Sequence, residues 1–132
     1  MKIKTHFFQN DIHSCGECAI RSILAMYGKI LYETLRTDSG TSVETMKKIL
    51  SSYGIHSVQK NITYDKIKRR SISYYPKSDH YVTIEKIKEN KLFINDSTKE
   101  FGEWVSKDEF LKLWTNGENT GWILQCRLKR RK

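Results

Sequence analysis

The stretch QNDIHSCGECAIRSILAMYG, residues 9–28, joins a polar loop to the start of an amphipathic helix. Ser14 suits the N-cap position and Glu17, three residues on, suits its capping-box partner, so the helix is predicted to begin at Cys15. Apolar residues then recur at helical spacing, and Gly28 stands where a left-handed cap glycine belongs. The pattern therefore predicts a helix with a cysteine in its first turn.

The predicted position of Cys15 favours a reactive thiolate. The first N–H groups of a helix have no intrahelical partners, and the helix dipole places partial positive charge beside them. Both effects lower the pKa of a thiol from its usual value of about 8.5. Gly16 has no side chain and so leaves room for a substrate backbone. A buried structural cysteine produces the same local pattern, so this stretch alone leaves both interpretations open.

The length and composition predict a single globular domain. The chain has 132 residues, with 38% hydrophobic and 30% charged residues, which fits one domain with a real core. We divide residues 1–132 into a mainly helical part, 1–54, and an antiparallel sheet part, 55–132. No apolar run reaches the length of a membrane span, and the N-terminus lacks a signal-peptide pattern. With three cysteines, these features predict a cytoplasmic protein.

The first part of the chain has the spacing of helices. A short helix is predicted at residues 31–36 and a loop at 37–40. Thr41 and Glu44 form a second candidate capping box, ahead of an apolar stripe that Gly54 ends.

The second part changes to the alternation of strands. Strands are expected at residues 55–59, around 62 and 72–74, and at 80–87, 91–96 and 121–128. A turn at 76–79 precedes the clearest strand pair, 80–96. Ser106 and Glu109 form a third candidate capping box, before a helix that Asn116 and Gly117 end. Helices followed by antiparallel strands indicate an α+β fold.

Strand register places a histidine and a carboxylate on one face. Residues of equal parity share a sheet face, and a turn at 88–90 puts Ile84 near Ile94. His80 and Asp96 then become diagonal neighbours at the open end of the ladder. A one-residue bulge between the strands would disturb this parity. Taken alone, His80 is more simply interpreted as a surface histidine, and Asp96 as a turn residue.

Taken together, these residues have the chemistry of a cysteine nucleophile. Cys15 would attack, His80 would take and return a proton, and Asp96 would orient the imidazole. Gln9, six residues before the cysteine, is placed to donate its amide to an oxyanion together with the Cys15 N–H.

At these positions the sequence resembles the papain-like cysteine peptidases that process bacteriocin precursors. The matching residues are Gln9, Asp11, Ser14, Cys15, Gly16, Tyr27, Gly28, Leu35, Arg36, Gly40 to Ser42, His80 to Val82, Asp96, Phe110 and Trp114. The resemblance covers nearly the whole chain in the family's order. Ser14 replaces an acidic residue that is common before the cysteine, and Ser97 replaces a proline that commonly follows the aspartate.

The resemblance implies a papain-like α+β fold and a specific activity. It implies a Cys15–His80–Asp96 triad with Gln9 at the oxyanion hole, and no cofactor or metal. The substrate implied is a precursor peptide with an amphipathic leader, cut after a double-glycine motif. We expect a stand-alone form that meets its substrate in trans, with a separate ABC exporter as a further candidate partner.

The charge balance indicates an acidic partner. The formal net charge is +9 and the pI is about 9.5, which favours binding to acidic molecules. Lys66, Lys68, Arg69 and Arg70 form a basic cluster that we predict binds an acidic leader. A second basic cluster, at the C-terminus, is expected to be a solvated tail. No recognition helix, zinc module or aromatic RNA platform accompanies the charge, so we do not expect nucleic acid as a partner.

Other functions remain open on the sequence alone. Residues 15–18 read CGEC, the C-x-x-C spacing of thiol-disulfide proteins, although no βαβ pattern surrounds them. Relatives that only bind leader peptides are a further alternative. Zinc binding by Cys15, Cys18, His6 and His13 is weaker, because no second ligand pair of matching spacing exists.

Overall fold

The computed structural model describes residues 4–8, 15–31, 41–115 and 118–130. Its elements, in chain order, are α1 (Cys15–Met26), α2 (Val43–Ser52), β1 (Ile55–Thr63), the 3-10 turn η1 (Tyr64–Lys66), β2 (Ser71–Tyr75), β3 (His80–Lys88), β4 (Lys91–Asn95), β5 (Glu103–Ser106), α3 (Lys107–Trp114) and β6 (Thr120–Leu128). Within these ranges α1 and α2 precede every strand, which confirms the predicted α+β class.

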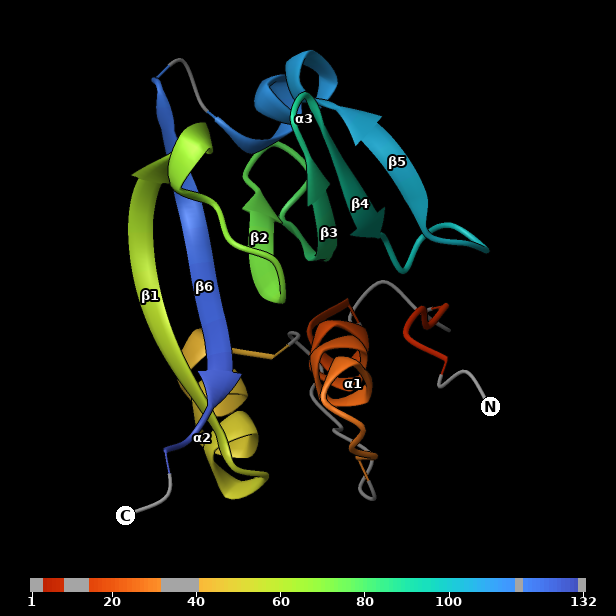
Figure 1. The fold of residues 1–132 in the computed structure, drawn as a ribbon, viewed down its shortest axis with the longest axis vertical. Coiled ribbons are helices and arrows are strands. Elements are labelled where there is room, and N and C mark those ends of the chain that lie inside the picture. Colours follow the sequence, from red (N-terminus) through yellow and green to blue (C-terminus); the bar gives the residue numbers. More distant parts are fainter. Residues whose placement is uncertain (1–3, 9–14, 32–40, 116–117, 131–132) are drawn as a thin grey trace.

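The strands form one antiparallel sheet in the order β1-β6-β2-β3-β4-β5. Strands β1 and β6 pair along their whole length, from Ile55 opposite Leu128 to Thr63 opposite Thr120. In Figure 1 this long curved pair runs down beside α2, while the shorter strands β2 to β5 lie above α1. The sheet therefore joins two halves of the molecule.

The bounds of helix α1 agree with the sequence prediction, whereas its predicted N-cap residue, Ser14, lies outside the described residues. Its first residue is Cys15 and its last is Met26. Gly28 has a φ of 73°, a backbone conformation that glycine adopts without steric cost. The N–H of Lys29 donates to the carbonyl of Leu24, and that of Gly28 donates to Ala25. These two bonds form the Schellman cap that satisfies the last carbonyls of the helix.

The predicted cap of α2 is wrong by one residue. Ser42, not Thr41, is the N-cap, and its hydroxyl accepts from the Thr45 N–H at 3.2 Å. Thr41 is instead buried. Thr41 and Ser42 both carry a hydroxyl that could cap the helix. Because Thr41 packs in the interior, Ser42 takes the cap position. The predicted end at Gly54 is confirmed, with a φ of 83°.

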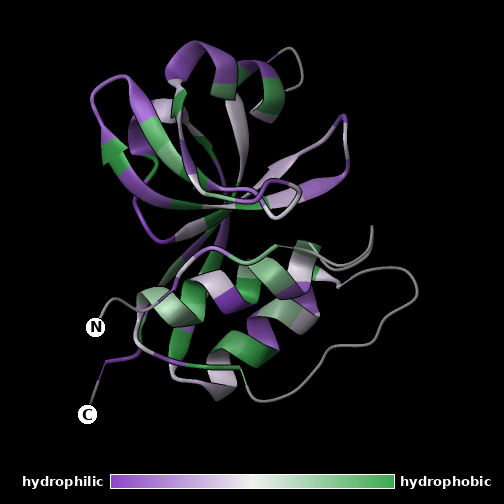
Figure 2. Ribbon diagram, turned by 90° about the vertical axis from the view of Figure 1, so that its right-hand side faces the viewer, coloured by the Kyte–Doolittle hydropathy of each residue, from purple (hydrophilic) through white to green (hydrophobic). Residues whose placement is uncertain are grey.

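Two apolar cores lie on the two sides of the sheet. One core joins α1 and α2 to the sheet, and the other packs α3 against β2 to β5. The first includes Ile20, Leu24, Met46, Leu50, Ile72 and Leu124, and the second includes Val82, Ile84, Leu92, Ile94, Phe110 and Trp114. Figure 2 shows the two helices packed together below and α3 with the short strands above. No helix in the described part of the chain has the length and apolarity that a membrane crossing needs.

The pairing of β3 with β4 confirms the predicted hairpin. Ile84 lies opposite Ile94, and Ile87 lies opposite Leu92. A bulge occurs between Ile84 and Lys86. A bulge of this kind could have disturbed the parity on which the predicted pairing of His80 with Asp96 depends. It lies on the turn side of Ile84, so the alternation of residues 80–84 is undisturbed.

Some elements differ from the prediction. Strand β1 continues to Thr63, beyond the predicted end at residue 59, because β6 pairs with it throughout. Strand β5 was not predicted, since its four residues carry little alternation of their own and gain their pairing from β4. The predicted helix at residues 31–36 lies outside the described residues, except for the non-helical Leu31. The predicted helix stop at residues 116–117 also lies outside them.

Replacing Gly121 with alanine should destabilise the fold. A Cβ atom at this position would lie 2.2 Å from Cε2 of Trp114, a side chain that is 2% exposed. We expect Gly121→Ala to lower the free energy of unfolding by about 1–3 kcal/mol, because the packed ring has little room to move. Urea denaturation measures this change. In a Trp114→Phe background the cost should shrink, and an equal cost in both backgrounds would contradict this explanation.

Candidate active site

Cys15 occupies the positively polarised start of α1, as the sequence predicts. It is half-buried and is hydrogen-bonded to the His80 side chain and to the backbone N–H groups of Tyr81 and Gly16. Burial opposes ionisation of the thiol, but these hydrogen bonds and the charge of His80 outweigh it, so the pKa of Cys15 lies below its ordinary value. Cys15 is therefore set up to exist as a thiolate.

His80 and Asp96 meet as the register argument predicts. His80 Nε2 lies 2.7 Å from Asp96 Oδ1, and the two side chains are 11% and 15% exposed. A carboxylate only accepts hydrogen bonds, so Nε2 carries the proton in this pair. The other ring nitrogen, Nδ1, is then left for Cys15. The imidazole thus connects the thiol to the carboxylate.

Thr98 holds the carboxylate of Asp96 in place. Its backbone N–H donates to Asp96 Oδ1 at 3.0 Å, and its hydroxyl donates to the same oxygen at 2.7 Å. Burial alone would raise the pKa of Asp96, but the bonds from His80 and Thr98 lower it to about 2. Thr98 is not among the site residues predicted from the sequence. Its spacing of two residues after an aspartate, typical of an Asx-turn, was the available signal.

The histidine is cationic over a wide pH range. Burial on its own would lower the pKa of His80, but hydrogen bonds to Asp96 and Cys15 raise it to about 9. With the pKa of Cys15 lowered and that of His80 raised, the arrangement favours a thiolate beside an imidazolium. This ion pair is the reactive state of a thiol nucleophile.

Contacts between α1 and the sheet bring these groups together. The Ser22 hydroxyl lies 2.9 Å from the Thr83 hydroxyl in the buried interface between α1 and β3. One turn after the nucleophile, Cys18 is hydrogen-bonded to Ser97, the residue that follows Asp96. Cys18 therefore links α1 to the end of β4.

The C-x-x-C alternative is poorly matched by the structure. Cys15 and Cys18 are both free thiols. Burial is the main cause that raises the pKa of Cys18 to about 11, so it is a poor thiolate. The thioredoxin-like reading also expects a parallel βαβ unit, whereas the strand pairs within the described ranges are all antiparallel.

Close packing explains why residue 16 is a glycine. The glycine is buried, and a Cβ atom on it would lie 2.7 Å from the Cβ of Thr41. The absence of a side chain therefore lets residue 41 pack against the start of α1. The role of Gly16 in substrate binding stays a prediction.

The basic cluster does not gather beside Cys15. Arg69 and Arg70 line an open pocket of about 420 Å³ together with Ala25 and Gly28. This pocket lies at the C-terminal end of α1, whereas Cys15 lies at its N-terminal end, about 18 Å away along the helix. The Arg70 guanidinium lies 4.7 Å from the centre of the Tyr27 ring. Lys66 and Lys68 are exposed nearby in the chain, in and after η1.

Two candidate residues from the sequence, one for the oxyanion hole and one for the zinc alternative, are not among the described residues. Gln9 and His13 lie outside the described residues, so the oxyanion role of Gln9 stays a prediction. Across the described ranges, no three histidine, cysteine or acidic side chains are grouped to hold a metal ion.

Comparison with known proteins identifies the family that the sequence matches. Residues 4–119 match the Peptidase C39 family. Two curated proteins are 27% identical over 125 residues: the sublancin-168-processing and transport ATP-binding protein SunT of Bacillus subtilis (strain 168), and its counterpart from Bacillus phage SPbeta. Each alignment covers 84% of this chain but only 18% of the relative.

Solved structures share the fold at low sequence identity. A double glycine motif protease from an AMS/PCAT transporter, in complex with the leader peptide, has a TM-score of 0.77 and 18% identity, covering 94% of this chain and 91% of its own. The peptidase domain of Streptococcus ComA has a TM-score of 0.72 and 17% identity, covering 94% and 97%. The papain-like α+β fold predicted from the sequence is thereby confirmed.

Removing His80 should return Cys15 to an ordinary or weaker thiol. In His80→Ala the hydrogen bond and positive charge are lost while burial remains, so the pKa of Cys15 rises. We expect its alkylation by iodoacetamide at pH 7 to slow by about tenfold or more, as followed by mass spectrometry across a pH series. Cys18→Ser should leave the wild-type profile unchanged. An unaltered profile in His80→Ala would contradict the ion pair.

Proposed function

The chain belongs to the peptidase C39 family, and we propose that it is a cysteine endopeptidase that removes the leader from a ribosomally made precursor peptide. The proposed cut follows a Gly-Gly pair. The observation that carries the proposal is the bonded series from Cys15 through His80 to Asp96. It joins a lowered thiol pKa to a proton donor and an orienting carboxylate, which is the set of groups that acyl transfer needs.

In the first chemical step, the Cys15 sulfur attacks the carbonyl carbon of the scissile peptide bond. A C–S bond forms, and the carbonyl oxygen becomes an oxyanion. When the tetrahedral intermediate collapses, the C–N bond breaks, and the His80 imidazolium gives its proton to the leaving amine. The products are a thioester on Cys15, a neutral His80 and the free amine of the mature peptide.

In the second step, the neutral His80 acts as a general base. It takes a proton from water while the water oxygen attacks the thioester carbonyl. The C–S bond then breaks, and the leader is released with a new carboxylate. Asp96 keeps the imidazole oriented and stabilises its charged form in both steps, and the ion pair is restored for the next turnover.

The oxyanion of both steps requires hydrogen-bond donors. We propose the side-chain amide of Gln9 and the backbone N–H of Cys15 for this role. The N–H groups in the first turn of α1 have no intrahelical acceptor and lie at the positive end of the helix dipole, which supports the second of these donors.

The substrate class rests on the family and on the relatives. One similar structure is described as a double glycine motif protease bound to a leader peptide, and the curated relatives process sublancin 168. These descriptions support a leader peptide with a Gly-Gly end as the substrate here. The chain spans 18% of the length of those relatives, so a transporter partner, such as an ABC exporter, is likewise part of the proposal.

Replacing Cys15 with alanine should abolish cleavage of a Gly-Gly precursor. The decisive assay mixes the protein with precursor peptides and identifies the products by mass spectrometry. Wild type should release a leader that ends in Gly-Gly, while Cys15→Ala should still bind the precursor. Cleavage that survives this substitution would overturn the mechanism. Binding without cleavage by the wild type would instead identify a leader-binding protein.

The pH dependence of kcat/KM should follow the ion pair. Activity should rise on the acid side as Cys15 loses its proton, below the pH of an ordinary thiol. It should fall above about pH 9, where His80 loses the proton that the leaving amine needs. Asp96, with a pKa of about 2, stays ionised throughout this range. A profile that keeps rising above pH 10 would contradict the proton-donor role of His80.

Charge reversal in the basic cluster should weaken substrate binding without slowing chemistry. We expect Lys66→Glu, Lys68→Glu and Arg69→Glu together to raise KM for a precursor with an acidic leader, by about tenfold at low salt, because attractive charges become repulsive. The value of kcat should hold, since Arg69 lies at the far end of α1 from Cys15. Unchanged kinetics would remove this cluster from the leader-binding surface.

A further inference from the structure

A row of large side chains crosses four strands next to the nucleophile. Asn61 of β1 pairs with Trp122 of β6, and Tyr74 of β2 pairs with Tyr81 of β3. The β2–β6 register, continued by one residue from Ser73 opposite Ile123, places Tyr74 beside Trp122. Residues opposite one another on neighbouring strands share a face, so these four side chains lie in one line across the sheet.

The aromatic members of this row form a packed cluster. The ring centres are 5.1 Å apart for Tyr74 and Tyr81, 5.7 Å for Tyr81 and Trp122, and 6.4 Å for Tyr74 and Trp122. All three side chains are only partly buried, so the cluster keeps surface for a ligand. Its rings are held by one another and present a fixed shape.

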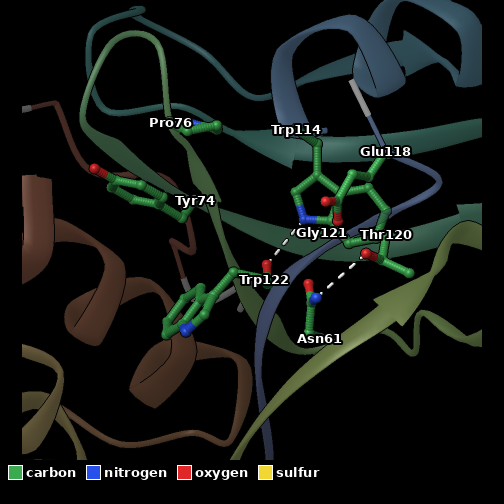
Figure 3. Close-up of a pocket in the computed structure, with 8 residues that line it drawn as sticks. All are labelled: Asn61, Tyr74, Pro76, Trp114, Glu118, Thr120, Gly121 and Trp122. Atoms are coloured by element: carbon green, nitrogen blue, oxygen red, sulfur yellow. Dashed lines mark hydrogen bonds between the residues drawn. The ribbon is translucent and has the colours of Figure 1, made fainter. Parts of the chain in front are cut away.

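An open pocket of about 290 Å³ lies at one end of this cluster. Figure 3 shows Tyr74 and Trp122 on one side of it, Trp114 and Glu118 on the other, and Pro76 above. The Trp114 indole N–H donates to the carbonyl of Trp122 at 2.8 Å. The wall on that side is therefore fixed to β6.

The pocket is connected to the candidate active site through Tyr81. The backbone N–H of Tyr81 donates to the Cys15 sulfur, and the Tyr81 ring contacts the rings of both Tyr74 and Trp122. A peptide whose scissile bond lies at Cys15 and whose chain follows this row of rings would reach the pocket. The row of rings therefore extends from the neighbourhood of Cys15 to the pocket.

The chemistry of the pocket favours a positive charge. Tyr74, Trp114 and Trp122 contribute aromatic rings to its walls, and the exposed Glu118 contributes a carboxylate. None of the described residues that line the pocket is a lysine or an arginine, in a chain whose net charge is +9. Aromatic faces and a carboxylate together attract cations.

We propose that this pocket is a subsite that binds a lysine or arginine side chain of the peptide substrate, close to the cleaved bond. The inference rests on the proposed peptidase function and adds a preference to it. The cation lies against the faces of Trp122 and Tyr74 while its charge faces Glu118, and the aliphatic stem covers Pro76. A cation over aromatic rings near a carboxylate gains about fivefold to thirtyfold in affinity over an uncharged side chain of equal length.

The test uses synthetic peptides that contain a Gly-Gly pair. Each position that flanks the pair carries, in turn, lysine, norleucine or glutamate, so that length is matched and charge varies. With the wild type we expect one position at which lysine exceeds norleucine by about tenfold in kcat/KM, with glutamate the poorest. If no position separates lysine from norleucine, the proposal is wrong.

Substitutions then assign the effect to the pocket. Glu118→Gln should reduce the lysine preference, Glu118→Lys should transfer it to glutamate, and Trp122→Leu should weaken it for any charge. Glu100→Lys changes the net charge equally at an exposed residue that does not line the pocket, so it should leave the preference intact. An equal loss in Glu100→Lys would show a long-range charge effect and overturn the subsite.

A binding measurement separates this inference from the peptidase proposal. Cys15→Ala, titrated with the same peptides, reports the pocket through the fluorescence of Trp114 and Trp122. If the wild type cleaves no peptide but Cys15→Ala still prefers lysine, the subsite stands and the proposed reaction fails. If the wild type cleaves the peptides but neither assay shows a preference for lysine, the proposed reaction stands and the subsite is wrong.

Discussion

The packing of α1 against β3 is the contact on which the candidate site depends. The nucleophile comes from the first turn of the helix, whereas the histidine and the aspartate come from the β3–β4 hairpin. The buried pair Ser22 and Thr83 lies in this interface. A small rotation of the helix would separate Cys15 from His80, and the thiol would then experience burial without the compensating positive charge. Position and reactivity are therefore set by one interface.

Within that interface, each buried charge is unfavourable by itself and is stabilised by the opposite charge beside it. Burial disfavours the ionised form of Cys15, His80 and Asp96. The His80 imidazolium compensates the charge of both the Cys15 thiolate and the Asp96 carboxylate. Two hydrogen bonds from Thr98 stabilise that carboxylate further. Removing one member leaves the others buried and uncompensated, so the series acts as a unit.

Local patterns predicted most of the fold, and register predicted the pairing of His80 with Asp96. What the sequence could not show arose from long-range contacts. Packing of Thr41 moved the α2 cap to Ser42, and pairing with its neighbours extended β1 and created β5. The bulge after Ile84 was equally invisible, because one extra residue leaves no mark in an alternating pattern. The aromatic row likewise needs the β6 register, which joins residues far apart in the chain.

The separation of the reactive groups along the chain has a consequence during synthesis. A ribosome that has released only α1 and α2 has exposed the cysteine but not the histidine, which follows 65 positions later in the sequence. The nascent thiol therefore keeps its ordinary, mostly protonated state. Thiolate chemistry begins only when the hairpin has emerged and docked on α1, so the sulfur of a nascent chain stays unreactive until that point.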